Sequence, residues 1–215
     1  VERQRLRWPL LDAFREAAAQ YGIPKTADFN RGDNDGSGYF EVTQRRGWRW
    51  SSADAFLRPA RGRRNLRIVT GAVVDRIALK EGEARGVHFS LNGVAHYASA
   101  SAEVVLSAGA IGSPAILQRS GIGDGAMLQD LDIVPLHHLP GVGGNLQDHL
   151  QIRCAWQVSG ISTLNERASS LWGKARIGLE YLLNRSGPMA MAPSQLGLFT
   201  RSHPHLARSE EHTSE

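Results

Sequence analysis

The chain has 215 residues, of which 41% are hydrophobic and 21% charged, and its formal net charge is +4 at pH 7. This composition is typical of a globular chain with a packed core and excludes an intrinsically disordered or low-complexity protein. The single cysteine, Cys154, excludes an intramolecular disulfide and is expected to be a half-buried structural thiol.

An amphipathic helix is expected over residues 9–21 near the start of the chain. Pro9 lies near its beginning and Gly22 follows its end, which are the preferred places for these two residue types. The apolar positions recur at helical spacing: Leu10, Phe14, Ala17, Ala18 and Tyr21.

From Asn65 onward the pattern becomes that of short β-strands. We expect strands at residues 66–70, 72–79, 85–90 and 94–98, separated by glycine-containing turns. Asn92-Gly93 is a strong signal for a two-residue hairpin turn, because both residues tolerate a positive φ.

Residues 104–123 have the pattern of a strand, a tight turn and a helix. The apolar residues 104–106 predict a buried strand, and the small residues 107–110 allow the backbone to approach a ligand closely. Ser113 is a suitable N-cap, Pro114 suits the first helical position, and Gly121 can end the helix in the left-handed conformation. The pattern therefore predicts a helix over residues 114–119 and a turn that faces a ligand.

Three further elements are expected in the second half of the chain. Short strands are predicted at residues 131–136 and 151–158. A helix is predicted from about residue 170 to 183, ended by Asn184 and Gly187-Pro188.

The segment Gly109 to Gly123, with the sequence GAIGSPAILQRSGIG, resembles the second signature of the glucose-methanol-choline (GMC) family of FAD-dependent oxidoreductases. The loop Leu139 to His149, LPGVGGNLQDH, is similar to another loop of that family. Upstream pieces around Asp28, Arg49 and residues 55–59 and 65–71 continue the resemblance, which covers roughly residues 10–200 and is strongest to choline dehydrogenase-like bacterial enzymes.

The resemblance implies a mixed α/β fold and two partial domains. Residues 1–150 would belong to an FAD-binding, Rossmann-like domain with a β-meander, without its G-x-G-x-x-G unit. Residues 151–207 would begin a substrate-binding domain. The polar residues 208–215 match a translated sequencing adapter and are expected to be a non-native tail, so the chain is expected to be an internal fragment.

The implied function is the oxidation of an alcohol, choline-like or another primary alcohol, by hydride transfer to FAD. The family's catalytic histidine pair is expected beyond the C-terminus, so no catalytic residue is assigned, and the fragment alone is expected to be inactive and poorly soluble. A dehydrogenase is preferred over an oxidase, and the electron acceptor is open. The alternatives are an FAD-containing hydroxynitrile lyase of the same family and a non-catalytic basic binding module.

Three residues are candidates for contact with FAD. Val74 matches the family's adenine-side valine, which reads adenine through its backbone N–H and C=O. Ala108 and Gly109 follow as second candidates at the exit of the strand, and Ser107 and Asn145 are weaker ones.

The basic character of residues 45–67 raises the nucleic-acid alternative, since arginines are interleaved there with Trp48 and Trp50. No nucleic-acid module supports it, so we expect a solvated surface and no nucleic-acid partner. The arginines are Arg45, Arg46, Arg49, Arg58, Arg61, Arg63, Arg64 and Arg67.

No metal site is expected. The stretch Asp33 to Gly36 fails the register of a calcium loop, because Arg31 and Val42 occupy its first and twelfth positions. The pairs His137-His138 and His203-x-His205 lack further ligands at metal spacing.

No signal peptide or membrane-spanning stretch is visible, and a cytoplasmic or membrane-peripheral location in a bacterium-like cell is expected. Four large residues in the final third are candidates for a substrate pocket, although core packing is the preferred interpretation of each: Trp156, Met189, Met191 and Phe199.

Overall fold

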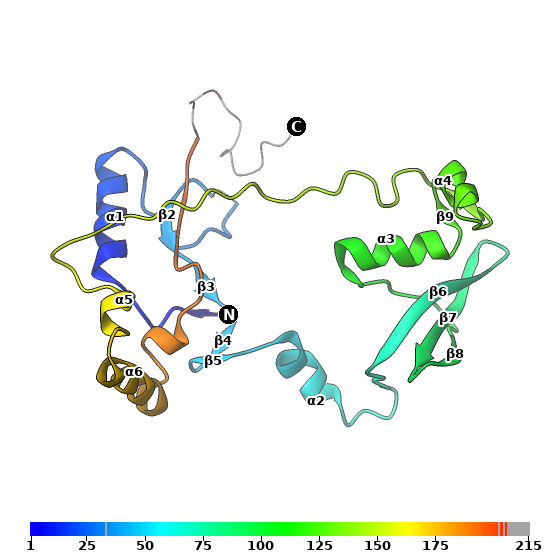
Figure 1. The fold of residues 1–215 in the computed structure, drawn as a ribbon, viewed down its shortest axis with the longest axis horizontal. Coiled ribbons are helices and arrows are strands. Elements are labelled where there is room, and N and C mark those ends of the chain that lie inside the picture. Colours follow the sequence, from blue (N-terminus) through cyan, green and yellow to red (C-terminus); the bar gives the residue numbers. More distant parts are fainter. Residues whose placement is uncertain (33, 202, 204, 206–215) are drawn as a thin grey trace. The chain divides into compact units, whose positions relative to one another are not determined.

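The computed structural model describes residues 1–32, 34–201, 203 and 205 (Figure 1). The chain divides into two compact units, one of Val1–Leu66 with the described residues from Ala155 on, and one of Arg67–Cys154. The first unit thus combines residues from both sides of the boundary expected near residue 150. The assignment of residues 1–150 to cofactor binding and of 151–207 to substrate binding stays a prediction, and residues 208–215 lie outside the described part.

The first unit contains short strands, two longer helices and several short helical turns. Its elements are β1 (Glu2–Arg3), α1 (Pro9–Gln20), β2 (Gly36–Tyr39), β3 (Glu41–Val42), β4 (Gln44–Arg45), β5 (Trp48–Arg49), the π-helical turn η1 (Ala53–Leu57), α2 (Arg58–Ala60), α5 (Leu164–Arg167), α6 (Leu171–Asn184), the 3₁₀ turn η2 (Pro188–Ala190) and β11 (Leu196–Phe199). Antiparallel pairs join β1 to β3, β4 to β5, and β2 to β11. The last pair connects the two distant chain segments of this unit.

The expected first helix is confirmed as α1. Pro9 occupies its first position and Gly22, with φ of +98°, follows its end. Ala18 on the apolar face is buried, at 7% exposure.

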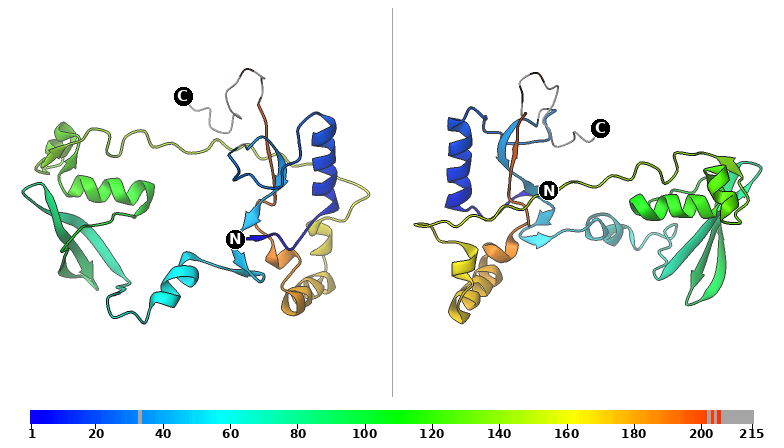
Figure 2. Two further views of the ribbon diagram at one scale, coloured as in Figure 1. Left: turned by 180° about the vertical axis from the view of Figure 1, so that it is seen from behind. Right: turned by 45° about the horizontal axis from the view of Figure 1, so that its top comes forward.

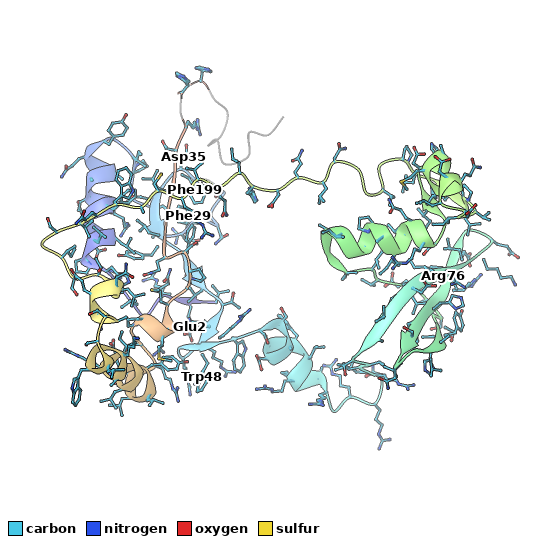
Figure 3. The ribbon with its side chains drawn as sticks, viewed as in Figure 1. Glu2, Phe29, Asp35, Trp48, Arg76 and Phe199 are labelled. Carbon is cyan, nitrogen blue, oxygen red and sulfur yellow. The ribbon has the colours of Figure 1, made fainter. Side chains whose placement is uncertain are left out.

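An aromatic cluster holds β2 and β11 together. The ring centre of Phe29 lies 4.8 Å from that of Phe199 and 5.3 Å from that of Phe40. Phe29 and Phe199 are labelled in Figure 3. The expectation of core packing is therefore confirmed for Phe199. It is wrong for Trp156 and Met189, whose side chains are 83% and 58% exposed.

The expected second long helix is confirmed as α6. Ser170 caps its start by accepting a hydrogen bond from the Gly173 backbone N–H at 3.0 Å. The left-handed residue at its end is Arg185, with φ of 52°, one residue after the expected Asn184. A short preceding helix, α5, was not expected, although Thr163 and Glu166 form a capping box that the sequence displays.

The second unit has a three-stranded antiparallel sheet in the order β6 (Ala72–Lys80), β7 (Glu83–Leu91) and β8 (Val94–Ser99). Asn92 and Gly93 have φ of 52° and 80° and form the expected hairpin turn. Helix α3 (Gly109–Arg119) lies beside this sheet (Figures 1 and 2). The remaining elements are β9 (Ile122–Gly123), α4 (Gly125–Asp130) and β10 (His137–His138), with β9 and β10 parallel.

Helix α3 begins five residues earlier than residue 114. Ser113 is therefore inside the helix instead of capping it, and Pro114 interrupts its hydrogen bonds instead of starting it. The Ser113 hydroxyl still accepts a hydrogen bond from the Ala108 backbone N–H at 2.9 Å, so it secures the first turn from within. Gly121, with φ of +80°, ends the helix as expected.

Four expected strands do not form: residues 66–70, 104–106 and 151–158 are irregular, and 131–136 is replaced by β10 one residue later. A strand requires a neighbour for its backbone hydrogen bonds, and apolar sequence alone does not provide one. No strand of the described chain pairs with residues 104–106, and Val105 is 78% exposed.

Candidate functional site: a cavity between strand β6 and residues 103–108

A cavity of about 530 Å³ lies in the second unit between the β6–β8 sheet, the segment before α3, and α3 itself. This volume falls within the range of small-molecule pockets. The lining is mainly apolar and includes Val74, Ile77, Val87, Ala98, Val104, Val105, Leu106, Ala108 and Ile116.

Two of the three candidate FAD residues lie in this cavity. Val74 lines it from β6 and Ala108 lines it from the residue before α3. The weaker candidate Ser107 also lines it. Gly109 follows directly but is not part of the lining, and its φ of +83° explains why glycine occupies the position.

Ser120 attaches α3 to the outer edge of β6. Its hydroxyl accepts a hydrogen bond from the Ile77 backbone N–H at 2.8 Å and donates one to the Ile116 carbonyl at 2.6 Å. The side chain is buried, at 3% exposure. Because β7 is the only strand that pairs with β6 among the described residues, this bond satisfies a donor that would otherwise be orphaned.

Arg119 makes a second attachment to the same edge. Its Nε donates to the Asp75 carbonyl oxygen at 2.8 Å, and its Nη2 lies 3.4 Å from the Val74 carbonyl oxygen. The two residues together fix the wall of the cavity that Val74 contributes. Apolar walls beside a strand edge suit a flat aromatic ring with polar atoms at its rim, such as adenine, so the residues present fit that part of FAD.

Asn145 lies elsewhere in the second unit. It lines a separate cavity of about 660 Å³ between α3 and the glycine-rich loop at residues 141–147. In that loop the Gln118 side-chain amide donates to the Val142 carbonyl oxygen at 3.1 Å, and a Cβ at Gly143 would lie 2.6 Å from Gln118 Nε2. Glycine at 143 thus permits the close approach of the loop to α3.

Two other polar candidates have structural partners, whereas Asp33 lies outside the described residues. Asp35 forms an ion pair with Arg201 at 2.9 Å, and His138 Nδ1 accepts a hydrogen bond from the Gly125 backbone N–H at 3.0 Å. Within the described part of the chain no group of three or more His, Cys, Asp or Glu residues is arranged to hold a metal ion. Cys154 is exposed and lies in an exposed, irregular segment, so the expectation of a half-buried thiol is wrong.

Several arginines of the basic segment have local partners. Arg58 pairs with Asp54 at 2.7 Å, and Arg45 lies over the Trp50 ring with its guanidinium carbon 5.0 Å from the ring centre. The pKa of Asp54 is held below its usual value, mainly by the hydrogen bond from the Ser51 hydroxyl. These contacts agree with a solvated surface with internal pairs.

Comparison with known proteins gives the family. Residues 1–151 match the GMC oxidoreductase family model. Human mitochondrial choline dehydrogenase is 43% identical over 204 residues, which cover 95% of this chain and 34% of that protein. The oxygen-dependent choline dehydrogenase of Vibrio vulnificus (strain YJ016) is 39% identical over 198 residues, 92% of this chain and 35% of that protein.

Solved structures agree with the match to this family. An FAD-dependent oxidoreductase from Chaetomium thermophilum superposes with a TM-score of 0.82 at 25% identity, covering 90% of this chain and 35% of that one. Pyridoxine 4-oxidase from Mesorbium loti gives a TM-score of 0.62 at 39% identity, covering 66% and 28%.

The chain belongs to the GMC oxidoreductase family, and it spans about a third of the length of the curated relatives it matches. The expected α/β fold is confirmed, and the FAD expectation is confirmed at the level of the family. The relatives named above are two choline dehydrogenases, an oxidase and an FAD-dependent oxidoreductase, and the hydroxynitrile lyase alternative finds no support among them. In the part of the chain that the structure describes, no helix has both the length and the apolarity to cross a membrane.

Proposed function

We propose that this chain is part of an enzyme that oxidises a primary alcohol, choline or a choline-like compound, with FAD as its cofactor. The observation that carries the proposal is the identity of 43% to a choline dehydrogenase over nearly the whole chain. FAD supplies the acceptor for the hydride that leaves the alcohol carbon. We assign no catalytic residue to this chain.

The contribution of the chain is to hold the adenine end of FAD. Val74 and Ala108 line the apolar cavity from two different elements, β6 and the approach to α3. Burial of the two flat faces of adenine between apolar walls removes them from water, which favours binding by roughly 25 cal/mol for each Å² of apolar surface covered. Gly109 would bring the first turn of α3 close to the cofactor.

The rigidity of this cavity supports its proposed role. Ser120 and Arg119 fix α3 against β6, so that Val74 and Ala108 keep their spacing before the ligand arrives. A preformed pocket loses less conformational entropy on binding than a pocket that must order itself.

The test of the function uses the longest reading frame that contains this chain. We expect the purified product to carry bound flavin and the flavin absorbance to bleach when choline or another primary alcohol is added without oxygen. Cleavage of a cyanohydrin without bleaching would show a lyase instead, and a product that binds no flavin would support a non-catalytic binding module.

The test of the site uses Ala108→Phe in the same protein. The larger side chain would occupy the cavity, and we expect the flavin-to-protein ratio to fall at least about fivefold, since steric overlap of this kind costs about 1–3 kcal/mol. Ala102→Phe is the matched control, since Ala102 is exposed nearby and does not line the cavity. Equal flavin content in the two variants would show that adenine binds elsewhere.

A further inference from the structure

Helix α6 of the first unit has an inner side that neighbouring elements hold in place. Ile177 is the buried residue of this side. The Tyr181 hydroxyl donates a hydrogen bond to the Gly47 carbonyl oxygen at 3.3 Å. Glu180 forms an ion pair with Arg167 at 3.2 Å. These contacts fix the rotation of the helix about its axis, so they also define the side that faces away from Ile177.

The opposite side of α6 is apolar and exposed, at the edge of the first unit (Figures 1 and 2). At about 100° of rotation for each residue, its apolar residues fall within about 60° of the direction opposite Ile177. The large ones among them are at least 56% exposed. A surface helix normally turns its apolar side inward, so this arrangement is inverted. The outer face of α6 consists of Leu171, Trp172, Ala175, Leu179, Leu182 and Leu183.

Positive charges flank the outer face of α6 on both sides. In the same projection Lys174 lies beyond Leu171 on one side, and Arg176 lies beyond Leu183 on the other. Both charged residues are exposed. The one acidic residue of α6, Glu180, lies on the inner side in its ion pair. The exposed side of this helix therefore combines apolar residues with positive charge and has no carboxylate of its own.

This combination suits the surface of an anionic membrane. Apolar side chains enter the boundary between headgroups and acyl chains, while lysine and arginine extend to the lipid phosphates. Tryptophan, here Trp172, is enriched at the level of the headgroups. A partner protein would need a carboxylate opposite each of the two cations, whereas an anionic bilayer presents phosphates on both sides of the helix. The 14 residues of α6 rise about 21 Å, less than the roughly 30 Å of the hydrocarbon core, so the helix suits the plane of the interface.

We propose that the outer face of α6 binds the surface of a membrane that contains anionic phospholipids. Leu179 and Leu182 enter the boundary between headgroups and acyl chains, and Trp172 lies at the level of the headgroups. Lys174 and Arg176 bind lipid phosphates on the two sides of the helix. This inference concerns the attachment of the protein to a membrane and does not depend on the proposed reaction.

The experiment is flotation with lipid vesicles of the longest reading frame that contains this chain, because that polypeptide also shows whether another segment covers α6. One set of vesicles contains phosphatidylcholine and phosphatidylglycerol in equal parts, and the other contains phosphatidylcholine alone. We expect binding to the anionic vesicles to be at least about tenfold tighter, since each cation near an anionic surface contributes about fivefold. High salt should reduce this difference, because it screens the charges.

Trp172→Ser tests the apolar part of the outer face. We expect it to weaken vesicle binding at least about tenfold, because one large apolar side chain is no longer buried in lipid. Tyr21→Ser is the matched control, since Tyr21 is an aromatic residue after α1 with the same exposure of 87%, and it should leave binding within about twofold. Trp172→Phe keeps the apolar character, so it should bind like the wild type but show less quenching of tryptophan fluorescence by brominated acyl chains.

Lys174→Gln combined with Arg176→Gln tests the charge. We expect this double variant to lose about tenfold or more in binding to the anionic vesicles and to bind pure phosphatidylcholine as the wild type does. Arg63→Gln combined with Arg64→Gln is the matched control, because these two arginines are exposed in another segment of the same unit. It should leave binding to the anionic vesicles within about threefold.

Three results would overturn the proposal. A wild-type protein that does not float with the anionic vesicles would mean that another segment or a second copy covers the outer face of α6. Equal losses in Trp172→Ser and Tyr21→Ser would mean unspecific adhesion of exposed apolar surface. Equal losses in the two charge variants would mean diffuse attraction of a basic protein. If Trp172→Ser loses its helical circular dichroism, Leu179→Ser takes its place, because Leu179 is exposed on the same face.

Discussion

At the scale of single residues, Ser120 connects two elements that the sequence does not show to be neighbours. We expect Ser120→Ala to lower the free energy of unfolding by about 1–3 kcal/mol, because the Ile77 backbone N–H would remain buried without an acceptor. Chemical denaturation measures this change. Ser101→Ala, at an exposed position, is the control and should change stability by less than about 0.5 kcal/mol. A similar effect of both substitutions would contradict the attachment of α3 to β6 through Ser120.

Position 47 requires glycine because of both its backbone conformation and its surroundings. Its φ is +78°, and a Cβ there would overlap the Arg185 carbonyl oxygen. We expect Gly47→Ala to destabilise the first unit by at least about 1–3 kcal/mol, measured by thermal or chemical unfolding. Gly62→Ala is the control, since a Cβ at Gly62 would meet nothing within 4 Å and no positive φ is needed there. Equal stability of the two variants would contradict the close approach of Arg185.

The raised pKa of Tyr39 can be tested at high pH. Its pKa is raised to about 12, first by burial and then by its hydrogen bond to Asp12, so the neutral phenol is favoured in the folded state. A raised pKa contributes stability that is complete below the unfolded value of about 10 and is lost as the pH rises toward 12. Asp12→Asn should lower the pKa of Tyr39, and ultraviolet titration of the phenol in both proteins measures it, with Tyr39→Phe identifying the signal. An unchanged titration in Asp12→Asn would show that the negative charge of Asp12 has no part in the shift.

At the scale of elements, the caps of α6 show what local sequence controls. The Ser170 hydroxyl satisfies one of the free N–H groups of the first turn. We expect Ser170→Ala to cost about 1 kcal/mol, as N-cap substitutions usually do. Urea denaturation followed by circular dichroism measures it, with the exposed Ser194→Ala as a control. No difference between the variants would mean that tertiary packing alone holds this end of the helix.

The same scale separates elements that were predictable from those that were not. Helices α1 and α6 and the β6–β7–β8 meander follow from periodicity, prolines, glycines and Asn92-Gly93, all of which act within a few residues. The strands expected at residues 104–106 and 151–158 do not form, because a strand is stable only when another strand or helix covers it. The early start of α3 escaped prediction because Ser113 and Pro114 suit a helix start, whereas Gly109 supplies the turn that begins it.

At the scale of the whole molecule, much apolar surface remains uncovered. Val105, Ile111 and Val134 of the second unit are 73–78% exposed. Monomeric soluble proteins rarely leave large contiguous apolar surface in water. We therefore expect the isolated chain to self-associate, and analytical ultracentrifugation with and without non-ionic detergent measures this.

Charge placed on that surface provides the control for self-association. Val105→Lys combined with Ile111→Lys should reduce the association in water, whereas lysine at the already polar position Ser101 should not. A monodisperse wild-type chain in water that retains stoichiometric FAD would contradict both the association and the expected lack of activity of the isolated chain.

The sequence by itself determined the family, the FAD expectation and the local elements, because signature residues, caps and turns act over short distances in the chain. The candidates Val74 and Ala108 also came from the sequence, through resemblance. Only the tertiary structure decided that the two line one cavity and that Ser120 holds α3 to β6. Such convergence depends on contacts between residues far apart in the chain, and no local pattern of residue types encodes them.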